Sequence, residues 1–252
     1  MLLSFLRRIA RPVVLAACLA GGAASAQAAC EPVTEDGHGY VVCRFDLARD
    51  ALSLYWRGAD GAPLASTTRL ADEVAAAGRK LVFAMNAGMY DTALAPLGLY
   101  IENGRMLHRA NLRSGSGNFH LKPNGVFYFG RGKAGVMETG RFLKARLAPD
   151  FATQSGPMLV IDGQIHPKLQ PDGASEKIRN GVGVRGETEV IFAISTEPVS
   201  FYAFAKLFRD RLDTQNALFL DGSISTLYAP PLSPVGGWRD LGPMLGVTTG
   251  PQ

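Results

Sequence analysis

At 252 residues with 47% apolar composition, the chain can form a large domain with a proper hydrophobic core, which excludes a disordered protein. Three of its 26 basic residues precede any acidic residue, so the rest of the chain carries 23 basic against 22 acidic residues despite the formal charge of +4. This near-neutral balance leaves no electrostatic footprint for nucleic acid, and we expect no nucleic-acid partner.

The first 28 residues have the pattern of a secretory signal peptide. Three early arginines precede an apolar run over residues 13–20, and two Ala-x-Ala cleavage sites lie within residues 24–28. The apolar run is too short to span a bilayer permanently, so we expect an exported domain of residues 29–252, periplasmic or secreted. The sequence LAAC, which ends at Cys18, also fits a lipoprotein cleavage box, and lipid anchoring there is the less favoured alternative.

Removal of this leader would discard Cys18 and leave Cys30 and Cys43. An even pair of cysteines in an oxidising compartment favours a disulfide, and we expect one between these two residues. The bridge would join the new N-terminus to the apolar strand YVVCRFD and would contribute about 2–3 kcal/mol in the chain-entropy model. A pair of free buried thiols is the alternative.

The following residues alternate short apolar runs with turn signals, which predicts many strands. We expect strands over residues 40–46, 81–85, 97–101, 106–109, 125–129, 157–161, 190–195 and 217–220. Two helices are expected, over residues 67–78 with Thr67 or Thr68 as the N-cap and over residues 200–212 with Ser200 as the N-cap. Because the strands follow one another without regular helical crossovers, the pattern predicts an α+β fold, a single domain of mixed β-sheets with few flanking helices.

Two predicted hairpins resemble each other. GLYIENGRMLH at residues 98–108 and PMLVIDGQIHP at residues 157–167 each combine an apolar strand, an acid, an Asn-Gly or Asp-Gly turn and a returning strand with a histidine. An internal pseudo-duplication would explain the pair, and independent convergence on a good hairpin sequence is the alternative.

Several familiar motifs are absent or out of context. GVGVRG at residues 181–186 has the dinucleotide-binding spacing, but a strand follows where that motif needs a helix. SGSG at residues 114–117 lacks the spacing of a nucleophile elbow. The four histidines give no metal-ligand pattern, so we expect no metal site and no cofactor; a divalent cation is an alternative that ligand spacing does not support.

Polar side chains stand beside glycines at the ends of apolar strands. Asn86 follows one strand, Gln154 and the pair Arg179 and Asn180 precede two others, and Asp221 ends a fourth. Such side chains converge on one edge of a sheet, and neighbouring glycines let a ligand approach the backbone. An arginine suits a phosphate, amides suit hydroxyl groups, and a carboxylate supplies acid or base, so this set predicts a site for an anionic sugar derivative.

The ordered elements MNAGMY, LKPNGVFYF, QSGPMLVIDGQIHP, RNGVGV, FAISTEPVSFYAFAKLFRDRL and NALFLDGSISTLYAP resemble the phosphodiester glycosidase family. The resemblance covers roughly residues 81–248. It implies an exported hydrolase that cleaves a sugar from a glycosyl phosphodiester and leaves a phosphomonoester. The substrate would be a sugar phosphodiester or a phosphoglycan.

Positions that match the motifs of this family imply catalytic roles for Asp221, Arg179 and Asn86. They imply substrate-binding roles for seven further residues: Gln154, Gly88, Gly156, Asn180, Gly222, Ser223 and Ser225. Ala87 and Ser223 stand where the family has glycine, and these added side chains bear on which sugar is bound.

In the implied chemistry, Arg179 stabilises charge on the departing phosphate while Asp221 steadies the oxocarbenium-like centre or directs water. Glu102 and Asp162 are weaker candidates for a second carboxylate, and His108 and His120 are candidates for a general acid. Two other functional classes stay open: a non-catalytic envelope module that binds glycan or phosphoglycan, and a serine hydrolase that acts through residues 114–116.

Overall fold

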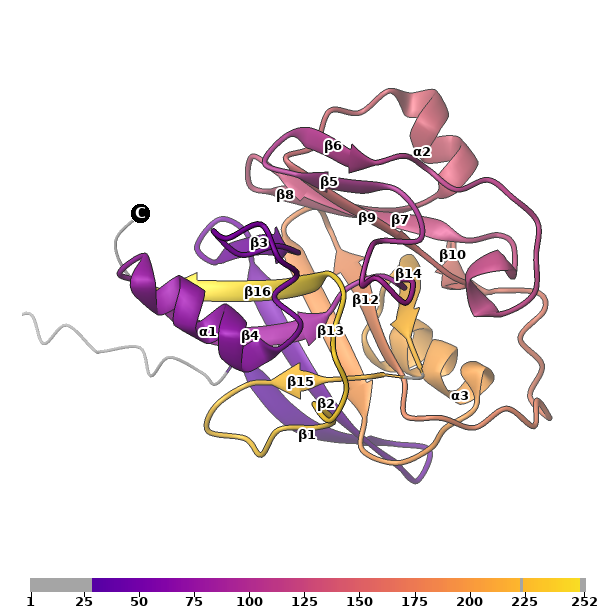
Figure 1. Ribbon diagram of the computed structural model, residues 1–252. Helices are drawn as coiled ribbons and strands as arrows, with labels where there is room; N and C mark the ends of the chain where they lie inside the picture. Colours follow the sequence, from indigo (N-terminus) through magenta and orange to yellow (C-terminus); the bar gives the residue numbers. More distant parts are fainter. Residues whose placement is uncertain (1–28, 223, 250–252) are drawn as a thin grey trace, which may run out of the picture.

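The computed structural model describes residues 29–222 and 224–249, which form three β-sheets and three short α-helices (Figure 1). The predicted signal peptide, Cys18 and Ser223 lie outside the described residues. This arrangement confirms the α+β class. Every strand pairing between described residues is antiparallel, in place of the mixed sheets that we expected.

The largest sheet has seven strands in the order β1–β2–β13–β12–β14–β10–β11. Their bounds are β1 (Cys30–Glu35), β2 (His38–Asp46), β13 (Glu189–Ser195), β12 (Asn180–Arg185), β14 (Asn216–Asp221), β10 (Met158–Ile161) and β11 (Gln164–Ile165). The central strands β12, β13 and β14 are buried along most of their length, since other elements cover both faces of the sheet.

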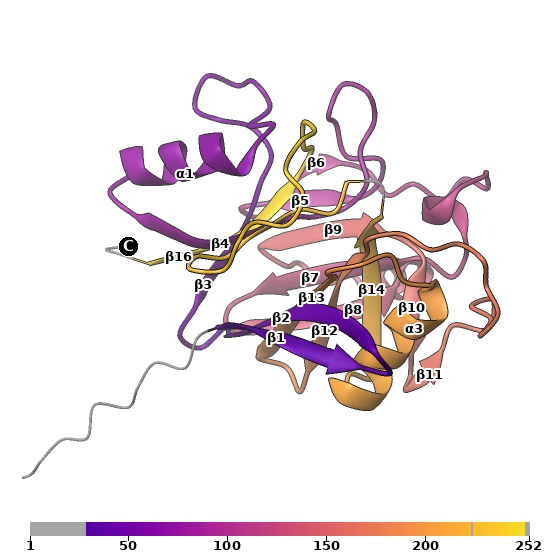
Figure 2. The same cartoon turned by 90° about the horizontal axis from the view of Figure 1, so that it is seen from below.

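Two smaller sheets complete the fold. The four-stranded sheet has the order β15 (Leu227–Tyr228), β4 (Lys80–Asn86), β16 (Met244–Thr249) and β3 (Ala51–Tyr55). The five-stranded sheet has the order β6 (Arg105–His108), β5 (Tyr100–Glu102), β9 (Phe151–Ser155), β7 (Gly125–Gly130) and β8 (Lys133–Glu138). The three sheets are stacked, with α1 and α3 on opposite sides of the stack (Figure 2).

Each helix covers a sheet face with its apolar side. Helix α1 (Thr67–Ala76) packs on β4, and its N-cap is Ser66, whose Oγ accepts a hydrogen bond from Arg69 N at 3.1 Å; the cap therefore lies one residue before the predicted Thr67. Helix α3 (Phe201–Lys206) continues into the π-helical turn η2 (Leu207–Arg211), and Ser200 caps it as predicted. Two further elements are α2 (Thr139–Ala145) and the 3₁₀ turn η1 (Asn118–His120).

Two glycines of β12 allow this helical segment to approach the sheet. A Cβ on Gly183 would lie 2.7 Å from Thr214 Cγ2 and 3.0 Å from Phe208 Cδ1, and a Cβ on Gly181 would lie 3.1 Å from Phe204 Cε1. These distances are shorter than van der Waals contact, so glycine is required for the close packing. The GVGV pattern therefore serves packing in a β12–β13 hairpin, and a strand follows it as the sequence predicted.

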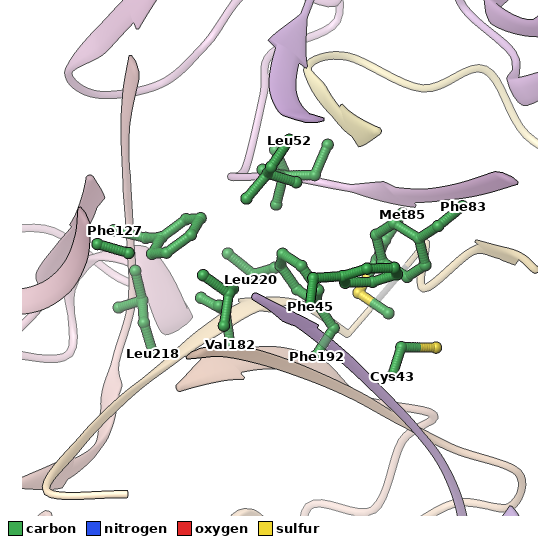
Figure 3. Packing of buried hydrophobic residues seen from close by; sticks show 14 of the residues in the cluster. Cys43, Phe45, Leu52, Phe83, Met85, Phe127, Val182, Phe192, Leu218 and Leu220 are labelled. Atoms are coloured by element: carbon green, nitrogen blue, oxygen red, sulfur yellow. The ribbon is translucent and has the colours of Figure 1, made fainter. Parts of the chain in front are cut away.

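The main hydrophobic core lies where the three sheets face one another (Figure 3). Phe83 of β4 stacks on Phe192 of β13 and packs against Phe45 of β2, with ring centroids 4.9 Å apart in both pairs. Phe127 of β7 meets Phe192 edge to face at 6.1 Å. Aromatic side chains from three sheets thus form one cluster, which joins the sheets into a single domain.

The predicted disulfide between Cys30 and Cys43 is confirmed, and it joins β1 to β2 as a directly opposed cross-strand pair. No helix within residues 29–222 and 224–249 is long and apolar enough to cross a membrane.

Both predicted hairpins are confirmed, as β5–β6 and β10–β11. Each lies at the edge of its sheet, β5–β6 in the five-stranded sheet and β10–β11 in the seven-stranded one, and the pseudo-duplication stays a prediction. Six strands of four or more residues lie outside the predicted strand ranges: β1, β3, β8, β9, β12 and β16.

Candidate active site

Three strand ends from two sheets meet at one place. Because β12 and β14 are antiparallel, Asn180 at the start of β12 pairs with Asp221 at the end of β14. Asn86 ends β4 in the neighbouring sheet, and its backbone carbonyl and side-chain oxygen both accept hydrogen bonds from Asn180 Nδ2, at 3.1 and 2.9 Å. The predicted convergence of Asn86, Asn180 and Asp221 is therefore present.

The two asparagines hold the acid-bearing strand end in position. Asn180 Oδ1 accepts a hydrogen bond from Asp221 N at 2.9 Å, and Asn86 Oδ1 accepts one from Thr226 N at 2.8 Å. Asn86 and Asn180 are fully buried, whereas 8% of the Asp221 surface is exposed to solvent. Asn86 Nδ2 is buried and has no hydrogen-bond partner among the described residues, so this amide has a donor to offer a ligand.

The chain after Asp221 folds back beside β12. Ser225 Oγ lies 2.8 Å from Asp221 O and 3.0 Å from Ile178 O, so its single proton is shared between two carbonyl groups. Ser225 thus closes the turn that contains Gly222. Ser223, the remaining predicted contact in this turn, lies outside the described residues.

Arg179 is buried directly beneath this turn. Its Nε donates to Val199 O at 2.8 Å, its Nη2 donates to Ser175 O at 2.6 Å, and its guanidinium stacks on the Phe201 ring at 3.5 Å. Nη1 lies 3.6 Å from the position that a Cβ on Gly222 would occupy. Two of the three guanidinium nitrogens therefore donate hydrogen bonds to backbone carbonyl groups, and the third, Nη1, faces the turn after Asp221.

Burial lowers the pKa of Arg179 to about 10, because desolvation disfavours the charged form. The group is still a cation at neutral pH. None of the ion pairs between residues 29–222 and 224–249 involves this guanidinium. Its partners are neutral: two backbone carbonyl groups, the Ser175 hydroxyl, and the rings of Phe201 and Phe219.

Tyr90, Arg239 and Asp240 were not predicted as site residues, yet they lie at its margin. Burial raises the pKa of Tyr90, and the nearby charges of Asp221 and Asp240 raise it further. Tyr90 OH donates to Asp240 O at 2.7 Å, so it connects the 89–97 loop to the segment before β16. The sequence held only a weak signal for this contact, since 150 residues separate its partners.

The side-chain amide of Gln154 binds protein backbone near the end of β9, and its predicted role in substrate binding stays a prediction. Its Oε1 accepts from Leu99 N at 3.0 Å and from Asn111 N at 2.9 Å, and its Nε2 donates to Asn111 O at 2.9 Å. These bonds occupy the amide with protein backbone, so Gln154 holds the loop around Asn111 on β9. Gly88 packs against β9, with the position of a Cβ only 2.8 Å from Gln154 O.

Gly156, the next predicted contact, precedes a cis peptide bond to Pro157. A Cβ at this position would lie 2.6 Å from Asn124 Cβ and 3.0 Å from Phe119 O, so the close packing requires glycine. Gly88 and Gly156 pack closely around β9, and Asn86, Asn180, Asp221, Gly222 and Ser225 lie together as the candidate site.

The weaker carboxylate candidates lie at the opposite strand ends. Glu102 accepts a hydrogen bond from Tyr100 OH at 2.6 Å, and burial raises its pKa, but its hairpin turn contacts Asp150 before β9 rather than the end of β9. Asp162 is exposed, pairs with Arg141 and lies beside Asn216 at the start of β14. In the part of the chain that the structure describes, no group of three or more His, Cys, Asp or Glu side chains could hold a metal ion.

The two histidine candidates lie on the side of the five-stranded sheet. His108 Nδ1 is 2.8 Å from Gly98 O, and His120 Nδ1 is 3.1 Å from Arg113 O. Both rings thus support the 98–120 segment through its carbonyl groups.

The fold and the site together define an α+β protein in which buried amides position one carboxylate at the meeting point of two sheets. A sequence model of the phosphodiester glycosidase family matches residues 79–248, and the chain belongs to this family. The chain is 41% identical over 179 residues to the uncharacterized protein YigE of Escherichia coli (strain K12), covering 71% of this chain and 70% of YigE.

Two solved structures share the fold. The zebrafish N-acetylglucosamine-1-phosphodiester alpha-N-acetylglucosaminidase catalytic domain, auto-inhibited by its pro-peptide, has a TM-score of 0.59 at 18% identity, covering 86% of this chain and 81% of that domain. A hypothetical protein from Synechocystis has a TM-score of 0.52 at 15% identity, covering 88% of this chain and 61% of its own. At these low sequence identities, the similarity to both structures shows a shared fold.

Proposed function

We propose that the chain is an exported phosphodiester glycosidase that hydrolyses the bond between a sugar carbon and a phosphate oxygen. Water adds to the anomeric carbon, the carbon–oxygen bond breaks, and the other partner leaves as a phosphomonoester. The observation that carries this proposal is the placement of Asp221 at the junction of β4, β12 and β14, held by Asn180 and Asn86, in a member of this family. Export rests on the N-terminal pattern and accords with the Cys30–Cys43 disulfide.

Asp221 is the proposed acid–base or charge-stabilising group. Its backbone is fixed by Asn180 and Ser225, and 8% of its surface is exposed. A carboxylate there can accept the proton of the attacking water and stabilise positive charge on the sugar ring. The departing phosphate is already a good leaving group, so its protonation matters less than in ordinary glycosides.

Arg179 is proposed to act through its charge. Nε and Nη2 bind protein carbonyl groups, so these two nitrogens do not offer a two-pronged contact to phosphate. The buried guanidinium instead provides a fixed positive potential beneath Gly222, which favours negative charge developing above the turn. Asn86 Nδ2 is proposed to donate to a hydroxyl or phosphate oxygen of the substrate.

The test is the release of free sugar from N-acetylglucosamine-1-phospho-methyl-mannoside and from analogues with other sugars. Replacement of Asp221 by Asn should lower kcat by about 10²–10⁴-fold, because general acid–base groups contribute that much. Asp162→Asn is the matched control, since this carboxylate is exposed and pairs with Arg141 at the other end of β14. Circular dichroism establishes that each variant is folded.

Undiminished turnover by a folded Asp221→Asn variant would assign the chemistry to another carboxylate. Binding of phosphoglycan without turnover, in the parent and across the sugar series, would replace the proposal with the alternative of a non-catalytic envelope module. Covalent trapping by a serine reagent at residues 114–116 would favour the serine hydrolase instead.

A further inference from the structure

A polar hollow lies beside the candidate active site. Its volume is about 330 Å³, and its lining consists of Asp91, Pro96, Leu97 and the segment 108–113. Small-molecule sites span about 300–1,000 Å³, so the hollow has the size of a small binding site. The loop of residues 89–97 forms one wall of the hollow and follows Asn86 of the candidate site in the chain, and Tyr90 pairs with Pro96 within this loop.

The lining is positively charged. It contains two arginines, Arg109 and Arg113, and one carboxylate, Asp91. Asp91 Oδ1 already accepts hydrogen bonds from Ala93 N and Ala95 N, both at 2.9 Å, and so serves its own turn. Among residues 29–222 and 224–249, no side-chain hydrogen bond or ion pair engages either guanidinium. The sequence has no Asp or Glu between Glu102 and Glu138 to neutralise them.

The backbone that carries these arginines is held in place from several sides. Gln154, with 1% of its surface exposed, bonds both backbone groups of Asn111 at 2.9 Å, and Asn111 Nδ2 donates to Leu97 O at 3.0 Å. Lys122 Nζ donates to Leu112 O at 2.7 Å. A buried amide therefore fixes the loop between two arginines, which lowers the entropic cost of binding an anion there.

We propose that this hollow binds a phosphate group of a phosphoglycan substrate, one that is distinct from the phosphate at the cleaved bond. This inference rests on the proposed function and names its substrate class: a chain with phosphate groups along its length rather than an isolated sugar phosphate. Guanidinium groups match the tetrahedral oxygens of phosphate with paired hydrogen bonds, and two of them flank the fixed Asn111 backbone. The role of Gln154 is then to position the anion-binding loop.

The first experiment measures binding of inorganic phosphate and of a short poly(glycerol phosphate) by calorimetry, for the parent and for Arg109→Gln and Arg113→Gln. Each substitution should weaken polymer binding by about tenfold, since it removes hydrogen bonds to a charged group. Arg211→Gln makes the same change in net charge at an exposed helical position remote in sequence, and it should bind like the parent. Equal affinities across all four proteins would overturn the proposal.

The second experiment needs no substitution. Phenylglyoxal should label Arg109 and Arg113 in the native protein, and poly(glycerol phosphate) should protect both from labelling while Arg211 stays reactive. If inorganic phosphate protected the arginines and the polymer did not, the hollow would be a site for free phosphate and the inference would be wrong. The absence of protection by both probes would also contradict the inference.

The third experiment separates this inference from the proposed function. On a substrate with a second phosphate one unit from the cleaved bond, both arginine variants should raise KM severalfold and leave kcat unchanged; on the singly phosphorylated substrate neither constant should change. Binding and protection without any turnover would support the hollow but refute the glycosidase. Turnover with identical KM values in all variants would support the glycosidase but refute the hollow.

Discussion

His166 is a buried titratable residue outside the candidate site. Its Nδ1 accepts a hydrogen bond from Lys168 N at 3.1 Å, while its buried Nε2 has no partner among the described residues. Burial lowers the pKa of His166, and the nearby positive charge of Lys168 lowers it further. The folded protein therefore holds this ring neutral under conditions in which the unfolded chain protonates it.

We expect His166 to make unfolding pH-dependent. Its contribution to stability is present above the unfolded pKa of about 6.5 and is lost as the pH falls below that value toward the lowered folded pKa, because the unfolded state then binds more protons. Urea unfolding measured from pH 7.5 down to pH 5 should show a free energy of unfolding that decreases as the pH is lowered. The His166→Gln variant should show a smaller decrease. The same slope in parent and variant would contradict the expectation.

At the scale of elements, the packing of helix against sheet depends on the glycines of β12. Gly183→Ala should lower the free energy of unfolding by about 1–3 kcal/mol, because the new methyl group would overlap Thr214 Cγ2 and the Phe208 ring. The measurement is chemical denaturation followed by circular dichroism.

Thr214→Ser provides a compensating change for this prediction. It removes the Cγ2 methyl group but keeps the hydroxyl, which donates to Phe208 O at 2.9 Å. In a double-mutant cycle the serine should recover part of the loss caused by Gly183→Ala. Strictly additive effects would show that the overlap with Thr214 is not the source of the destabilisation.

At the scale of the whole molecule, one aromatic cluster unites the three sheets, and Phe83 joins the four-stranded sheet to it. Phe83→Ala should cost about 3–5 kcal/mol, since it leaves a cavity between β2, β4 and β13. Tryptophan fluorescence and far-ultraviolet circular dichroism should report one coincident urea transition in the parent, because Trp56 contacts this same core. Separate transitions would mean that the sheets unfold independently.

Local pattern in the sequence was enough to predict the α+β class, both hairpins and the Ser200 cap. The period of apolar residues and the turn residues act over a few positions, so they can be read without the fold. The strands that were not predicted, such as β1 with CEPVTE and β9 with FATQS, have mixed polar composition. Pairing with neighbours distant in the chain stabilises them, which local propensity does not register.

The sequence by itself determined the family, the cysteine pair and the set of polar residues at strand ends. Only the tertiary structure decided which of them meet: Asn86 and Asn180 are 94 residues apart in the chain yet share a hydrogen bond that positions Asp221. It also assigned Gln154 to the backbone of Asn111 and bound two nitrogens of Arg179 to carbonyl groups. The physical reason is that residue type fixes the bonds a side chain is able to make, whereas the partners that the fold supplies decide which bonds remain for a ligand.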